Sequence, residues 1–300
     1  MNLLELVSMS LKGKVVLVTG SSKGIGFEIA REFAENKNSN VILCSRNIGQ
    51  CDSAAKRIHG STFSFEVDVA DDSSVEKFIK KISDKFNRVD VLVNNSGYPY
   101  DSILWNKKPH EVTISELERV LSVDLLGSVR LSRAIIPLML RSKVTYNGVS
   151  LADLHKPIAN PPNNKIEETT HVLNRLKKNY PKLRGGVIIT ISSTPAISGQ
   201  PGGFPYSIAK AGNIALTKCI AKEYGQYNIR AYSLALGNIS TKATINSLPE
   251  SMIIKAAKES PMNRWGDPVE VAKVATSIAE EDFSFANGNT IVIDGGTIIL

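Results

Sequence analysis

Seven short apolar segments alternate with segments of helical periodicity along almost the whole chain. Parallel strands need long crossover connections, usually helices, so this alternation favours a parallel sheet. No composition break or internal repeat divides the 300 residues. The sequence therefore predicts one α/β domain over residues 1–300, with a doubly wound, seven-stranded parallel sheet and helices on both faces. The predicted strands lie at 14–20, 40–46, 61–69, 89–97, 184–192, 228–237 and 289–296.

An insertion of about 40 residues, 142–183, precedes the fifth predicted strand and follows a long predicted helix at 113–141. Residues 141–184 contain nine Lys or Arg and three Asp or Glu, which is most of the net charge of +7. A basic segment of this kind is typical of a solvated surface, and we predict no nucleic-acid partner. Chain direction places the insertion away from the carboxyl ends of the strands. We expect it to hold a helix at 168–179 and to contact a subunit or partner.

The remaining composition predicts a cytoplasmic protein with no membrane partner. No apolar run approaches the length of a membrane span, and the first residues make a poor signal peptide. The three cysteines, Cys44, Cys51 and Cys219, lack metal-ligand spacing, which fits a reducing compartment without structural disulfides. We predict no metal site.

A glycine-rich turn follows the first strand and opens a helical pattern. Glycine lets the backbone approach a pyrophosphate, and a helix N-terminus favours its negative charge. The order strand, glycine turn and helix therefore predicts dinucleotide binding. The predicted contacts in this turn are Gly20, Ser22, Lys23, Gly24, Ile25 and Gly26.

Two basic residues, Lys23 in the glycine turn and Arg46 at the end of the second strand, predict which dinucleotide binds. The second strand ends in Ser45 and Arg46, where an NAD site usually has an acid for the ribose 2′-hydroxyl. Arg46 and Lys23 suit a 2′-phosphate through charge-assisted hydrogen bonds, which favours NADP(H) over NAD(H). The alternative is that both are solvated surface cations.

The third strand is predicted to end at Asp68 and Val69. Asp68 is a candidate acceptor for an adenine amino group, and Val69 offers a backbone amide beside it. The alternative is that Asp68 belongs to a helix N-cap next to Asp71.

Tyr206 and Lys210 are four residues apart, so a helix places them on one face. A free phenol ionises near pH ~10, and a neighbouring ammonium favours its ionised form. The pair therefore predicts a proton-transfer device, with an ordinary surface pair as the alternative. Ser193 precedes Tyr206 by 13 residues at the carboxyl end of a strand, where ligands bind in open α/β sheets.

Together these motifs resemble the short-chain dehydrogenase/reductase family, in its 3-oxoacyl-carrier-protein reductase-like subgroup. TGSSKGIG (19–26) is similar to its TGxxxGIG loop, and NNSG (94–97) is similar to its NNAG. Ser193, Tyr206 and Lys210 match its Ser…Tyr-x-x-x-Lys at the family spacing. NRWGDPVEVA and GNTIVIDGG match its C-terminal segments. The resemblance covers nearly the whole chain except 142–183 and implies a Rossmann-type fold.

The resemblance also implies roles for the site residues. Tyr206 donates a proton to the carbonyl oxygen in reduction and accepts one in oxidation. Lys210 favours the ionised form of Tyr206 and hydrogen-bonds the nicotinamide ribose. Ser193 holds the substrate oxygen. Further cofactor contacts are implied for Tyr206, Lys210, Asn95, Gly97, Gly237, Ile239 and Thr241.

The chain departs from the family pattern at two positions. Asp124 stands where the family usually has Asn, whose helix kink presents a backbone carbonyl to a relay water. We keep Asp124 as the fourth catalytic residue and expect its carboxylate to add a negative charge near Lys210. Leu236 replaces the usual Pro before Gly237. This replacement changes the backbone segment that the family places beside the nicotinamide.

The implied function is an NADPH-dependent carbonyl reductase of the 3-oxoacyl-carrier-protein reductase type. An NADP-dependent polyol or aldose dehydrogenase is the alternative enzyme. A noncatalytic NADP(H) sensor or nucleic-acid-binding module is the alternative outside enzymes. The implied partners are a carbonyl or alcohol substrate, free or carrier-linked, and copies of the chain in a homodimer or homotetramer. The segment 238–261 is polar and is predicted to be irregular. We expect the substrate to meet residues 98–105 and 200–204, with 238–261 as a mobile lid over it.

Overall fold

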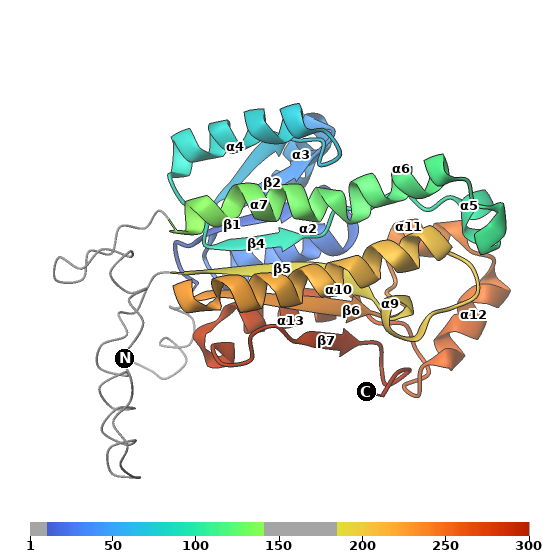
Figure 1. The fold of residues 1–300 in the computed structure, drawn as a ribbon. Coiled ribbons are helices and arrows are strands. Elements are labelled where there is room, and N and C mark those ends of the chain that lie inside the picture. Colours follow the sequence, from blue (N-terminus) through green and yellow to red (C-terminus); the bar gives the residue numbers. More distant parts are fainter. Residues whose placement is uncertain (1–10, 141–184, 300) are drawn as a thin grey trace, which may run out of the picture.

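The computed structural model describes residues 11–140 and 185–299, which form a single seven-stranded sheet in the order β3-β2-β1-β4-β5-β6-β7 (Figure 1). Every neighbouring pair of strands is parallel. The strand order reverses between β1 and β4, so the predicted doubly wound sheet is confirmed. The strands are β1 (Val15–Thr19), β2 (Asn40–Ser45), β3 (Thr62–Glu66), β4 (Val91–Asn94), β5 (Gly186–Ser193), β6 (Ile229–Leu236) and β7 (Thr290–Ile293).

Helices cover both faces of this sheet, and side chains of the central strands point alternately into two apolar cores. In β1, Val16 and Val18 join one core, while Val15 and Leu17 join the other. Because both faces are covered, these strands read as continuous apolar runs. The first core is covered by α2 (Gly24–Arg31), α3 (Ile48–Ala55) and α13 (Pro268–Ala279), and the second by α4 (Asp72–Phe86), α7 (Leu126–Leu140) and α10 (Phe204–Tyr224).

The helix predicted at 113–141 is interrupted, and the structure divides it into α6 (Ile114–Asp124) and α7. Leu125 stands between them with φ −110° and ψ −60°. The carbonyl oxygen of Asp124, at the break, accepts a hydrogen bond from Asn213 Nδ2 of α10 at 2.8 Å. The apolar periodicity continues through the break, which is why the sequence pattern predicted one helix.

Short helices lie beyond the carboxyl ends of the strands (Figure 1). They are α5 (Ser102–Asn106), α9 (Pro195–Ser198), α11 (Lys242–Ser247) and α12 (Glu250–Glu259). The prediction of irregular structure over 238–261 was therefore wrong. Neither α11, with 6 residues, nor α12, with 10 residues, has a fully buried residue, so no long pattern of core positions marked these helices in the sequence. The third strand also ends earlier than predicted, at Glu66.

The predicted insertion at 142–183 and its helix at 168–179 lie outside the described residues. Within the described ranges, no helix has both the length and the apolar character needed to cross a bilayer. Cys44, Cys51 and Cys219 are free thiols.

Candidate active site

The glycine turn after β1 adopts a conformation that side chains rarely tolerate. Gly20 and Gly24 have φ values of +62° and +60°. A Cβ on Gly26 would lie 2.4 Å from Asn95 Nδ2 and 2.6 Å from Gly20 O. Asn95 Nδ2 in turn donates to Thr19 O at 2.9 Å and to Gly20 O at 3.3 Å. The residue that follows β4 therefore braces the turn.

Helix α2 begins at this turn without a side-chain cap, since its N-cap residue is Lys23. The first N–H groups of a helix have no partner within the helix, and together with the helix dipole they favour an anion. Thr241 lies beside the same turn, with its Cγ2 3.7 Å from the position of a Cβ on Gly24. These residues fit the pyrophosphate of a dinucleotide.

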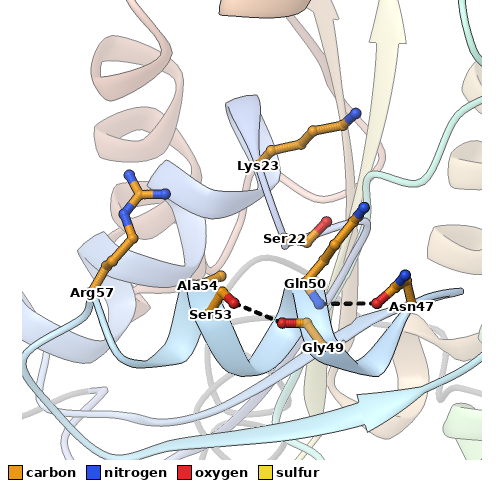
Figure 2. Close-up of a pocket in the computed structure, with 8 residues that line it drawn as sticks. All are labelled: Ser22, Lys23, Asn47, Gly49, Gln50, Ser53, Ala54 and Arg57. Carbon is orange, nitrogen blue, oxygen red and sulfur yellow. Dashed lines mark hydrogen bonds between the residues drawn. The ribbon is translucent and has the colours of Figure 1, made fainter.

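A cavity of about 380 Å³ opens between this turn and α3. Figure 2 shows Ser22 and Lys23 on one side and the α3 residues on the other, with Arg57 and Asn47 at opposite ends. Arg57, which the sequence analysis missed, places its guanidinium 4.4 Å from the ring centroid of Phe27. Arg46 is exposed and does not line this cavity. The cavity is lined by Ser22, Lys23, Asn47, Gly49, Gln50, Ser53, Ala54 and Arg57.

The thiols of Cys44 and Cys51 and the hydroxyl of Ser45 lie at the carboxyl end of β2. Ser45 Oγ donates to Asn47 O at 3.0 Å and lies 3.1 Å from Cys51 Sγ. Burial raises the pKa of both Cys44 and Cys51, so the thiols stay protonated and serve as small packing residues. The Ser45 hydroxyl therefore already donates a hydrogen bond within the local turn.

Asp68 and Val69 follow β3 at the same edge of the sheet. Asp68 Oδ1 accepts the Ala70 N–H at 2.9 Å, and its own N–H donates to Ser74 Oγ at 2.9 Å. Asp71, and not Asp68, caps α4 through the N–H groups of Ser73 and Ser74. A contact of Asp68 with adenine stays a prediction.

Ser193 belongs to β5, whereas Tyr206 and Lys210 lie near the start of α10, which packs against β5. Ser193 is the last residue of β5, and its Oγ donates to Leu236 O at 3.1 Å. Lys210 is 5% exposed, and its Nζ donates to Ile191 O at 3.2 Å. The same Nζ lies 5.5 Å from the ring centroid of Tyr206, one helical turn away. The predicted spacing therefore places an ammonium next to a phenol at the carboxyl edge of the sheet.

Asp124 lies beside this group at the end of α6. It is 1% exposed, and its Oδ2 lies 3.6 Å from Lys210 Nζ. Its Oδ1 accepts the backbone N–H of Tyr98. The structure therefore places the carboxyl group of Asp124 near Lys210, as expected.

Two aromatic side chains, Trp105 and Tyr100, pack near Tyr206, and no sequence pattern indicated them. The Trp105 ring on α5 lies 5.4 Å from the Tyr206 ring and 5.6 Å from the Tyr100 ring. Trp105 O accepts the Gly203 N–H at 2.7 Å. This contact joins the predicted substrate regions at 98–105 and 200–204, but no local pattern indicates that the two meet.

The segment after β6 passes close to β7. Gly237 N–H donates to Ile293 O at 3.0 Å, and a Cβ on Gly237 would lie 2.6 Å from Asp294 Cβ. Ile239 bridges to Gly266, and Thr241 caps α11 by accepting the Thr244 N–H. Gly237 is thus required by close packing even though Leu236 replaces the usual proline.

The sheet, glycine turn and Ser–Tyr–Lys group define an oxidoreductase, and the chain belongs to the short-chain dehydrogenase/reductase family, whose members use NAD(P). The family model described as short chain dehydrogenase matches residues 14–145, and one described as enoyl-(acyl carrier protein) reductase matches residues 168–297.

Among its relatives is the 3-oxoacyl-(acyl-carrier-protein) reductase of Thermotoga maritima, which is 30% identical over 97% of this chain and all of that protein. Glucose 1-dehydrogenase 2 of Bacillus subtilis is 27% identical over 95% of each chain. A crystal structure from Agrobacterium tumefaciens, provisionally named a gluconate dehydrogenase, matches with a TM-score of 0.76 and 21% identity over 98% of this chain and 99% of that one. This last likeness supports the fold.

Proposed function

We propose that this chain is an NADP(H)-dependent reductase of carbonyl groups, acting on a 3-oxoacyl group linked to a carrier protein or a similar thioester. The observation that carries the proposal is the Lys210 ammonium, which lies 5.5 Å from the Tyr206 ring centroid and 3.6 Å from Asp124 Oδ2, on a helix that packs against the strand ending in Ser193. A noncatalytic sensor needs the turn but has no use for a phenol–ammonium pair.

Each residue has a role that follows from its position. Tyr206 gives a proton to the substrate oxygen during reduction, and Lys210 stabilises the phenolate that remains. Ser193 orients the substrate oxygen once its hydroxyl turns away from Leu236 O, and stabilises charge that develops there. A bound nicotinamide supplies or accepts the hydride.

The preference for NADP(H) is supported by the basic groups around the cavity of Figure 2. Lys23 and Arg57 both line it, and no acidic side chain is among its lining residues. We propose that these two cations, with Arg46 next in sequence to the lining residue Asn47, hold the 2′-phosphate. The guanidinium is suited to bidentate contact with phosphate oxygens, and the ammonium adds a point charge.

Replacing Lys23 by Ala tests this preference. A charge-assisted hydrogen bond contributes about 1.5–3 kcal/mol, so kcat/KM for NADPH should fall by roughly 10- to 100-fold while that for NADH changes little. Lys56→Ala is the matched control, because Lys56 is an exposed cation next to Arg57 that does not line the cavity. Equal losses with both cofactors would contradict the assignment.

A sugar or polyol dehydrogenase is the second candidate, and the similarity to a glucose 1-dehydrogenase favours it. A panel of 3-oxoacyl thioesters, simple ketones, aldoses and polyols, each with NADPH/NADP and NADH/NAD, separates the two. We expect the highest kcat/KM with a 3-oxoacyl thioester and NADPH. Preferential oxidation of an aldose would select the second candidate, and no turnover with any pair would reject both.

We propose assembly into a homodimer or homotetramer through α6, α7 and α10. Apolar side chains stay exposed on these helices in the single chain, with Ile114, Leu126 and Ile208 between 39% and 69% exposed. Cytoplasmic localisation stays a prediction.

A further inference from the structure

The three oxygen atoms of Asp124 have unequal surroundings. The carbonyl oxygen accepts Asn213 Nδ2 at 2.8 Å and Ser128 Oγ at 3.4 Å. Oδ1 accepts the N–H of Tyr98. Oδ2 is buried and has no hydrogen-bond donor among the described residues. Only the carboxylate oxygen Oδ2, and not the carbonyl, is therefore left to act on a neighbour.

Lys210 is that neighbour. Its Nζ lies 3.6 Å from Oδ2, and the two side chains are 6% and 1% exposed. The ammonium has three N–H donors, and one of them reaches Ile191 O. Low exposure excludes most of the water that would screen the two charges, so their attraction is stronger than on a surface.

The groups packed around this pair include few other charges. Helix α10 contributes Tyr206 and the neutral Asn213, while β5 contributes only hydroxyls and carbonyls, from Ile191, Ser192 and Ser193. The loop after β4 contributes Tyr98, whose ring packs in a small apolar cluster with Ala209. The titratable groups that the structure places beside this pair thus include the phenol of Tyr206, near Lys210, and Tyr98, whose N–H binds Asp124.

We infer that Asp124 is a positioning residue whose carboxylate holds the Lys210 ammonium and offsets its positive charge toward Tyr206. This inference rests on the proposed function for the role of Tyr206. A phenolate beside a neutralised ammonium gains less stabilisation than one beside a free ammonium. Alcohol oxidation, which needs the phenolate, then requires a higher pH. Carbonyl reduction, which needs the phenol, persists to a higher pH. The pair therefore biases the enzyme toward reduction at neutral pH.

The substitution Asp124→Asn removes the charge and keeps the shape and an acceptor oxygen for Tyr98. We expect the pH of half-maximal alcohol oxidation, and the pH at which reduction declines, to fall by roughly one unit, a modest shift for the loss of an adjacent charge. The matched control is Asn213→Leu, which removes the donor to the Asp124 carbonyl and keeps the carboxylate. Its pH profiles should superimpose on those of the original protein. Thermal unfolding identifies variants that remain folded.

A second measurement does not depend on turnover. The ultraviolet absorbance of tyrosinate, followed against pH as the difference between each protein and its Tyr206→Phe counterpart, reports ionisation of Tyr206 alone. With Asp124→Asn, this signal should emerge about one pH unit lower. Superimposed titrations in folded proteins would overturn the inference, as would the same shift in Asn213→Leu. Unchanged turnover in Tyr206→Phe would instead reject the proposed function, which keeps the two failures distinct.

Discussion

The substitution Tyr206→Phe should lower turnover by about 10³-fold while NADPH binding stays within a few-fold of its original affinity. General acid–base groups contribute about 10²–10⁴-fold to rates. The Phe ring keeps the packing against Trp105, whose ring lies 5.4 Å away, so the fold of the site is preserved. The measurements are steady-state kcat with a ketone and NADPH, and NADPH affinity by fluorescence titration.

Tyr224→Phe is the control for this change. Tyr224 is the last residue of the same helix α10, about five turns from Tyr206, and its ring lies 6.3 Å from that of Tyr227. Loss of a hydroxyl there should leave kcat unchanged. A Tyr206→Phe enzyme with near-normal kcat would remove Tyr206 from the chemistry.

The substitution Gly26→Ala should nearly abolish dinucleotide binding. The added Cβ would lie 2.6 Å from Gly20 O and 2.4 Å from Asn95 Nδ2, and the backbone atom cannot move without distorting the turn that follows β1. Overpacking of this kind costs about 1–3 kcal/mol, and displacement of the N–H groups that face the phosphates adds to the loss. We expect NADPH affinity, measured by fluorescence titration, to fall by at least about 100-fold, with a lower Tm.

Gly225→Ala provides the matched control outside the cavity. A Cβ on Gly225 meets only Asn287 Nδ2, at 3.2 Å, and the residue has helical dihedral angles, with φ −59° and ψ −35°, at the end of α10. Its affinity for NADPH should change less than threefold. If Gly26→Ala bound NADPH as tightly as this control, the turn would not be the pyrophosphate site.

The positions of the central strands were predictable because these strands are covered on both faces and therefore consist largely of consecutive apolar residues. The group of Ser193, Tyr206 and Lys210 was predictable for a similar reason. Two of its members are separated by one helical turn, and the third ends a strand that the apolar pattern identifies. The helix break at Leu125 was not predictable from the sequence, because the periodicity of the flanking helices continues through it. Asn213, which donates to the Asp124 carbonyl oxygen at the break, is also far away in sequence.

The sequence by itself determined the class of fold, the glycine turn and the spacing of the phenol and ammonium, all of which depend on residues close together along the chain. The tertiary structure decided which distant side chains surround them. It places Arg57 in the cavity between the glycine turn and α3, packs Trp105 on Tyr206, and sets Asp124 Oδ2 3.6 Å from Lys210 Nζ. These contacts join separate helices and loops, and their distances result from how the elements pack, which local periodicity does not encode.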